Sequence, residues 1–301
     1  MMRVFQAPMS AHTRATLFIL CAAATFPVMA ALVKFLSSDF HPLQLAFFRC
    51  LFGGVVLIPF FLRRPAAIVT SRPRMHLFRG LLGVVSMWMG FTALSLLPLA
   101  EAVTLGFTRI LFLIPLAVLI MGDRVDLPRW TATLIGFGGI VLMVGPSGTD
   151  MAAAGVALSL TSALTIAGVK LTVKSLAETE ATLTIQLWFA GFATLATFVP
   201  ALFVWRWPEP FELLLLLAIG GAGTLGQMFT VLGLRGVQPS AVMPIDYTRL
   251  IFATFYGFLL FGQLPGPATI AGAGVIVAAT LYIARRGERV ATAELGLIRR
   301  R

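Results

Sequence analysis

The sequence predicts an all-α membrane protein with ten transmembrane helices, arranged as two inverted repeats of five helices. Three observations predict this fold: a very apolar composition, ten apolar stretches of membrane-spanning length, and an internal match at a spacing of 140 residues. Apolar residues make up 58% of the 301 residues and charged residues only 12%, whereas a soluble domain is about 45–50% apolar and about 25% charged. A soluble globule could not bury such a surplus, so the composition excludes a soluble enzyme and a disordered chain.

Each of the ten apolar stretches approaches the roughly 20 residues that a helix needs to cross a bilayer. The predicted spans are 15–36, 42–62, 80–97, 101–121, 129–144, 152–174, 181–205, 211–234, 241–261 and 267–284. Several connections are only a few residues long and contain Pro or Gly, which predicts antiparallel hairpins between neighbouring spans.

The 23 Lys and Arg residues orient the bundle. With the N-terminus in the cytoplasm, 18 of them fall on cytoplasmic segments, including Arg79 just before the third span and Lys170 near the end of the sixth. Only Arg206 falls in an outer loop. The positive-inside rule therefore places both termini in the cytoplasm of a cell with a bacterial-type inner membrane. Residues 3–30 also fit a secretory signal, but Pro27 and the internal repeat favour a retained first helix.

The internal repeat is clearest in the fourth and ninth spans. Residues 107–112 (FTRILF) align with residues 247–252 (YTRLIF), and a shared Thr-Arg pair in the middle of an apolar helix is unusual. Because the unit has five helices, the second copy must enter the membrane from the opposite side. Secondary transporters use such inverted repeats for alternating access to a central site. The predicted units are residues 15–145 and 151–285, followed by a basic cytoplasmic tail, 286–301.

With its ten spans, its duplication, Gly122-Asp123 at the end of helix four and a Gly-rich helix five, the chain resembles the EamA-type transporters of the drug/metabolite transporter superfamily. Family copies usually carry Glu after that glycine, where this chain has Asp123 and, in the second half, Gln263. The resemblance implies that helices one, three, four, six, eight and nine line a central cavity, with five and ten outside. It implies transport of a small metabolite, such as a riboflavin-like vitamin, S-adenosylmethionine, an amino acid or a drug.

Three ionisable residues inside spans are the main candidates for a solute site, because charges in a membrane usually face a cavity or a partner. Arg109 and Arg249 are repeat equivalents, which suits either a pair of solute anchors or a shared structural lock between helices. Asp246 lies three residues before Arg249 on the same helix face. It is either a proton-coupling carboxylate or the permanent ion-pair partner of Arg249.

Further predicted solute-site residues lie in the spans that the resemblance assigns to the cavity, and an alternative accompanies each role. These residues are Thr25, Trp88, Gln227 and Tyr247. The two aromatic rings could stack on a flat or cationic solute, or they could simply fill the core. Glu101 and Lys34 are predicted gating or coupling residues. Their alternatives are a favourable charge at a helix N-terminus and a side chain that snorkels to the headgroups. Arg49 is interpreted as a structural contact with neighbouring carbonyl groups.

The sequence contains no motif for other chemistry. There is no Walker-type loop, the three His residues are scattered, and Cys21 and Cys50 lie in apolar runs, so we expect no cofactor, metal site or disulfide scaffold. Topology accounts for the net charge of +11, which removes nucleic acid as a partner. The predicted partners are a small solute and the lipid bilayer, with protons as a candidate coupling ion and a homodimer left open. The rival hypothesis is a membrane-embedded enzyme or assembly factor.

Overall fold

The protein is described by a computed structural model that covers residues 11–116, 118–119, 127–144, 150–177, 179–234 and 246–298. All regular structure in these residues is helical, which confirms the predicted fold class. The helices are α1 (Ala11–Leu36), α2 (Pro42–Arg63), the short 3-10 helix η1 (Pro65–Ile68), α3 (Pro73–Leu96), α4 (Leu99–Gly106), α5 (Arg109–Leu116), α6 (Leu127–Val144), α7 (Asp150–Ala177), α8 (Thr182–Leu202), α9 (Pro210–Leu234), α11 (Thr248–Phe261) and α12 (Pro267–Ile298).

Within the described residues, seven helical segments are long and apolar enough to cross a membrane. They are Thr13–Leu36, Pro42–Arg63, Pro73–Leu96, Leu99–Leu116, Ala153–Val173, Thr182–Leu202 and Pro210–Thr230. Three shorter apolar helices, Trp130–Leu142, Thr248–Phe261 and Pro267–Ile283, match the other predicted spans. Residues 117, 120 and 121 of the fourth predicted span and residues 241–245 of the ninth lie outside the described residues, as does Asp123.

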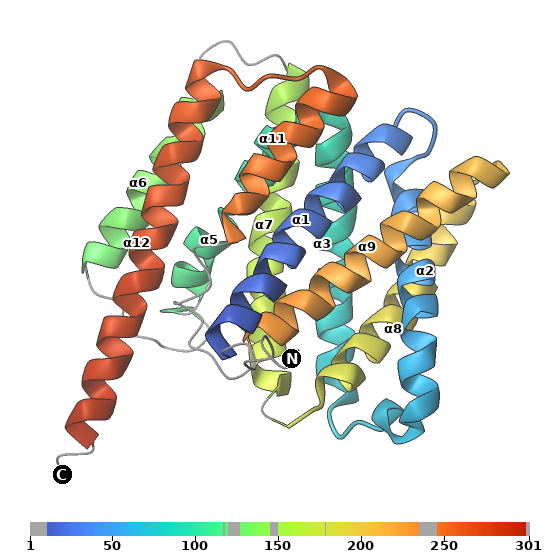
Figure 1. Ribbon diagram of the computed structural model, residues 1–301, viewed down its shortest axis with the longest axis horizontal. Coiled ribbons are helices and arrows are strands. Elements are labelled where there is room, and N and C mark those ends of the chain that lie inside the picture. The colour runs from blue at the N-terminus through green and yellow to red at the C-terminus, as the bar shows by residue number, and fades with distance from the viewer. Residues whose placement is uncertain are drawn as a thin grey trace, which may run out of the picture.

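The helices pack in pairs that follow the internal repeat (Figure 1). Helix α1 packs along α9, and its repeat equivalent α7 packs along α3. Helices α6 and α12 pair at one edge of the bundle, and α2 and α8 pair at the other. The connection after α1 lies at the top of Figure 1 and that after α7 at the bottom, so the two equivalent helices run in opposite directions.

Close packing between the halves depends on glycines. In α9, a Cβ atom on Gly220 would lie 2.8 Å from the backbone nitrogen of Gly53 in α2, nearer than real Cβ contacts allow. In α6, a Cβ atom on Gly139 would lie 3.0 Å from the carbonyl oxygen of Gly272 in α12. Small residues at such crossings let backbones approach closely in a membrane. The glycines of α6 and α12, the fifth and tenth predicted spans, therefore have a packing role at Gly139 and Gly272.

The fourth predicted span is not one continuous helix. It is divided into α4 and α5 by a turn at Phe107 and Thr108. At the turn the amide of Thr108 donates to the carbonyl oxygen of Leu105, at 3.0 Å, and its hydroxyl donates to the same oxygen at 2.6 Å. In both hydrogen bonds residue i donates to residue i−3, whereas in a regular α-helix the amide of residue i donates to residue i−4. In the second repeat, α11 begins at Thr248, the equivalent of Thr108.

Two basic residues that we counted as cytoplasmic lie further from the helix ends than the predicted spans indicated. Arg79 is six residues into α3, which begins at Pro73, and it is buried. Lys170 lies within α7, which is 28 residues long and continues to Ala177. The apolar runs alone did not show how far these helices extend. Most of the predicted basic tail, 286–301, is helical, because α12 continues to Ile298, as its many good helix formers favour.

Candidate functional site

The charged centre of the protein lies where the break between α4 and α5 meets the start of α11. Asp246 is shared between the two repeat-equivalent arginines. Its Oδ2 atom lies 3.4 Å from Nη2 of Arg109, and its Oδ1 atom lies 2.7 Å from Nε of Arg249. The three side chains are only 14–15% exposed. The ion pair with Arg109 therefore joins the two halves of the molecule, and the ion pair with Arg249 lies within the second half.

The two halves differ at this carboxylate. Arg109 donates from Nη1 to the carbonyl oxygen of Gly106, three residues earlier, at 2.9 Å. Arg249 forms its ion pair with Asp246, which is also three residues earlier. Gly106 and Asp246 are equivalent positions at the spacing of 140 residues. The second repeat thus uses a side-chain carboxylate where the first uses a backbone carbonyl freed by the broken helix.

Aromatic rings enclose the arginines. Phe107 and Tyr247, which are repeat equivalents, stack with their ring centroids 4.9 Å apart. The guanidinium carbon of Arg109 lies 5.1 Å from the centroid of Phe107, and that of Arg249 lies 4.2 Å from the centroid of Phe26 in α1. The Tyr247 hydroxyl is hydrogen-bonded to Thr280 of α12. These contacts hold the cations at fixed positions beside π-faces, where they are attracted electrostatically.

Lys170 is a member of the site that the sequence analysis missed. Its charge interacts electrostatically with Arg109, Asp246 and Arg249, and the residue is exposed. The four groups carry three positive charges and one negative charge, a net charge of +2. The available signal was a basic residue inside the sixth predicted span, and the sequence analysis counted it with the cytoplasmic helix end.

The other predicted solute-site residues are more scattered. The Thr25 hydroxyl, in α1, donates to the carbonyl oxygen of Cys21 at 2.5 Å. Gln227 is half-buried in α9, beside the glycine that contacts the Phe26 ring. Trp88 does not join the charged centre but packs with the cluster around Cys50, Val84 and Phe189. Its indole nitrogen is buried and has no hydrogen-bond partner in the described part of the chain.

Lys34 and Glu101 lie near the end of the bundle that is predicted to face outward. Lys34 donates from Nζ to the carbonyl oxygens of Leu94 and Leu97, at 3.0 and 2.6 Å, so it caps the last turn of α3. Glu101 accepts a hydrogen bond from Thr269 of α12 at 3.1 Å, and its charge also interacts with Lys34. Lys34 therefore binds backbone carbonyls, and Glu101 connects the first repeat to the second.

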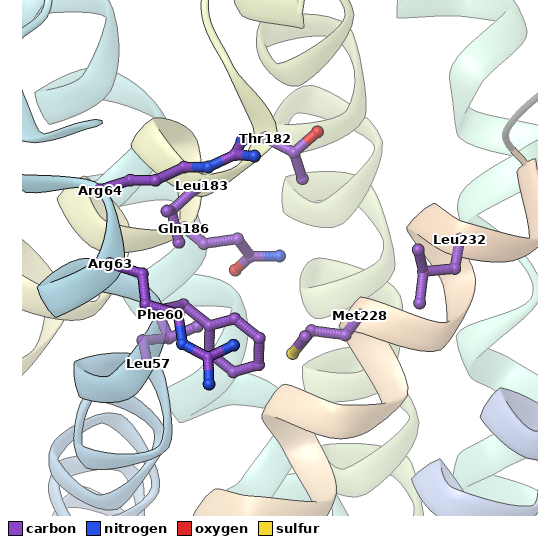
Figure 2. A pocket seen from close by; sticks show the side chains of 9 residues that line it. All are labelled: Leu57, Phe60, Arg63, Arg64, Thr182, Leu183, Gln186, Met228 and Leu232. Carbon is purple, nitrogen blue, oxygen red and sulfur yellow. The ribbon is translucent and has the colours of Figure 1, made fainter. Parts of the chain in front are cut away.

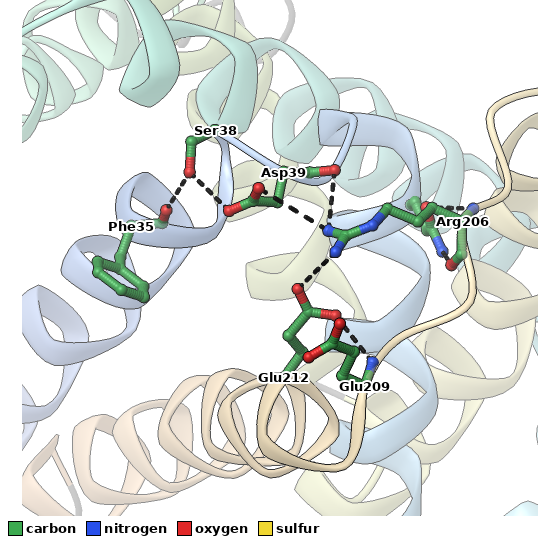
Figure 3. A network of polar contacts seen from close by, with 7 residues as sticks. Phe35, Ser38, Asp39, Arg206, Glu209 and Glu212 are labelled. Carbon is green, nitrogen blue, oxygen red and sulfur yellow. Dashed lines mark hydrogen bonds and ion pairs between the residues drawn. The ribbon is translucent and has the colours of Figure 1, made fainter.

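Further contacts between the repeats close the same end (Figure 3). Arg206, in the loop before α9, lies 2.9 Å from Glu212 and also contacts Asp39 after α1. The side-chain amide of Gln44 donates to the carbonyl oxygen of Arg206 at 2.6 Å. Gln263, at the position where the family usually has Glu, accepts from the amide of Leu99 at the start of α4, at 3.1 Å.

At the opposite end, Glu180 connects the loop after α7 to the loop before α3. It accepts hydrogen bonds from the Thr70 hydroxyl at 2.6 Å and from the Ser71 amide at 3.1 Å. The Thr70 bond is the main cause that lowers the pKa of Glu180 from its ordinary value. Arg72 reinforces the contact by donating to the carbonyl oxygen of Ser175 at 2.8 Å.

A separate cavity of about 360 Å³ lies between α2, α8 and α9 (Figure 2). It is lined by Leu57, Phe60, Arg63, Arg64, Thr182, Leu183, Gln186, Met228 and Leu232. These residues come from the ends of α2 and α9 and the start of α8, which the positive-inside rule places toward the cytoplasm. The cavity does not include the charged centre. Among the described residues, no group of three His, Cys, Asp or Glu could hold a metal ion.

Comparison of the sequence with known proteins identifies its family. The sequence model of the EamA-like transporter family matches residues 13–145 and again 153–285. The S-adenosylmethionine uptake transporter of Rickettsia prowazekii is 31% identical over 251 residues, 83% of this chain and 85% of the relative. The riboflavin transporter of Rhizobium johnstonii is 29% identical over 284 residues, 91% of each chain. The pseudopaline exporter CntI of Pseudomonas aeruginosa is 29% identical over 278 residues, 89% of this chain and 95% of the relative.

A solved crystal structure matches the fold with a TM-score of 0.64 and 21% sequence identity, covering 92% of this chain and 99% of the other. The two matches to the family model coincide with the two halves that meet at Asp246. The chain is a multi-pass membrane protein and belongs to the EamA-like transporter family.

Proposed function

We propose that this carrier moves a small organic solute with a carboxylate or another anionic group, and that Arg109, Arg249 and Lys170 bind that group. The observation that carries the proposal is the net charge of +2 around one shared carboxylate. Asp246 neutralises one of the three cations, and an anion is needed to balance the rest. Guanidinium groups suit this role because their fork of donors matches a carboxylate.

The position of the site between the repeats supports alternating access. Asp246 connects a helix of the first half with a helix of the second, so a movement of one half against the other changes its contacts. A solute carboxylate would compete with Asp246 for the arginines, and Asp246 would return to them as the solute leaves. A proton that binds Asp246 in the solute-loaded state would couple transport to a pH gradient.

The relatives bear on the choice of solute. They are named for S-adenosylmethionine, riboflavin and pseudopaline. Of the first two compounds, S-adenosylmethionine carries a carboxylate and riboflavin does not. We therefore expect an amino-acid-like or other carboxylate solute rather than a neutral vitamin. We also propose that both termini face the cytoplasm, as the basic loops indicate.

The test is uptake of labelled S-adenosylmethionine and other carboxylate solutes into vesicles that contain the purified full chain. We expect Arg109→Gln and Arg249→Gln each to lower uptake at least about tenfold, because a hydrogen bond to a charged group contributes about 1.5–3 kcal/mol. Arg285→Gln, at an exposed position of α12, is the matched control. Recovery of a chemically altered product would support the enzyme hypothesis, and equal uptake by all variants would refute the proposed site.

A further inference from the structure

A second pair of arginines lies in the half of the bundle formed by α2, α3 and α8. Arg49 is 8% exposed and Arg79 is 6% exposed. Both guanidinium groups face the ring of Phe189, with their central carbons 3.7 Å (Arg79) and 5.6 Å (Arg49) from its centroid. The two positive charges are near enough to repel each other. In the described part of the chain, neither arginine takes part in a salt bridge.

The hydrogen-bond donors of this pair are incompletely satisfied. Nε and Nη1 of Arg79 are buried and have no partner among the described residues. Both ring nitrogens of His76, one turn earlier in α3 and 1% exposed, also have none. An unpaired buried charge is strongly destabilising, and a buried polar group without a partner commonly marks the place of an ion or water. Two cations and several free donors in one place therefore call for an anion.

We propose that Arg49 and Arg79 form an oxyanion-binding site, which takes a phosphate or carboxylate group and is separate from the solute site at Asp246. An oxyanion suits the pair better than a monatomic ion because it can accept hydrogen bonds from two guanidinium forks at once. Phe189 holds both groups on its faces, so that the donors stay in place when the site is empty. The site does not depend on the proposed solute site.

The cavity in Figure 2 supplies the approach from the cytoplasmic end. Arg63 and Arg64 line it, and Arg64 extends toward Thr182. Gln186, in the wall of the cavity, lies one helical turn before Phe189 on α8. The cavity thus begins at Arg63 and Arg64 and reaches to within one helical turn of Phe189, the ring that both buried arginines face. Such an arrangement raises the local concentration of anions through the electrostatic field of the basic side chains.

The first experiment measures the melting temperature of the purified full chain in detergent, while inorganic phosphate replaces chloride at constant ionic strength. A ligand that binds only the folded state stabilises it, so we expect wild-type protein to melt at least about 2 °C higher in saturating phosphate. Arg79→Met should lose this response, and without phosphate it should melt no lower than wild type because it removes an unpaired charge. Arg74→Gln, at an exposed position of the same helix, should keep the full response.

The second experiment identifies the source of the oxyanion and does not depend on variants. Phosphorus NMR of free phosphate should show line broadening with wild-type protein. An excess of sulfate should reverse the broadening, because sulfate is an oxyanion that competes for the same site. In parallel, melting is compared in nanodiscs of phosphatidylglycerol and of phosphatidylcholine. Stabilisation by phosphatidylglycerol alone would assign the site to a lipid headgroup, and stabilisation by inorganic phosphate to a soluble anion. The proposal is overturned if neither source stabilises wild type, or if Arg79→Met responds as wild type does.

Discussion

Asp246 is the residue on which the proposed transport cycle depends, because both arginines of the repeat contact it. The sequence placed Asp246 and Arg249 on one helix face, so an ion pair between them was one of the two roles that it predicted for Asp246. It did not predict the contact with Arg109, which is 137 residues away in the chain. Such a contact depends on how the two halves pack, and this information is not present in the pattern of either helix alone.

Replacing this carboxylate should impair release of the solute more than its binding. In Asp246→Asn, the three cations lose the carboxylate that they share, so an anionic solute should bind more tightly and leave more slowly. We expect the maximal uptake rate to fall about tenfold or more and the KM to fall with it, as kinetics in vesicles would show. Glu209→Gln, at an exposed outer position, is the control. An unchanged rate in Asp246→Asn would exclude a coupling role for this residue.

Glu180 gives a pH-dependent prediction outside the membrane spans. Hydrogen bonds from Thr70 and Ser71 lower its pKa from the ordinary value of 4.5, so they favour the charged form in the folded protein. The resulting stabilisation is complete above about pH 4.5 and is lost as the pH falls through the lowered pKa. We expect Glu180→Gln to melt below wild type at pH 7 and the difference to shrink under acid conditions. Glu209→Gln, at the opposite end, should show no such trend.

At the scale of elements, the main departure from the predicted spans is the break between α4 and α5. A hydropathy pattern reports apolar length, and the apolar run continues through Phe107 and Thr108 without interruption. The break depends on a hydroxyl that bonds to a carbonyl and on an arginine that caps another. Irregular backbone at membrane depth is tolerated only where protein or water satisfies it. The shared Thr-Arg pair was the available signal, but the sequence analysis used it as evidence of the repeat and as a pair of solute anchors or a structural lock.

Contacts between α2 and α9 give a sharp test of helix packing. In Gly220→Ala the new methyl group would lie 2.8 Å from a backbone nitrogen of α2, so the helices must separate. We expect a loss of about 1–3 kcal/mol in stability, measured as a lower melting temperature in detergent. The adjacent Gly221→Ala is the matched control, because its Cβ atom would have no neighbour within 4 Å. Equal melting of both variants would contradict the tight crossing.

At the scale of the whole molecule, the repeat was the most informative feature of the sequence. It predicted the fold class and the two arginines that share Asp246. It did not predict the surroundings of the Lys170 and Arg79 side chains, because these depend on which helices pack around them. A count of basic residues near helix ends cannot separate a side chain at the membrane surface from one that points into the bundle. The structure makes this distinction through the contact of Arg79 with Phe189 and the electrostatic interaction of Lys170 with Asp246.

If both halves form the solute site, one half alone should not transport. A chain that ends at residue 145 lacks Lys170, Asp246 and Arg249, and with them most of the charged centre. We expect it to show no uptake above that of empty vesicles, and co-expression with residues 146–301 should restore part of the activity. Immunoblotting of membranes would show that the half is inserted. Full activity of the first half alone would refute a site shared between the repeats.

The first half has Gly106 at the position where the second half has Asp246. This difference affects which conformation the empty carrier prefers. A perfectly duplicated protein would spend equal time open to either side. Here the halves contribute different chemistry to the same junction, and the tether from Tyr247 to Thr280 has no counterpart at Phe107, which lacks a hydroxyl. The empty carrier should therefore favour one side of the membrane even when no gradient acts on it.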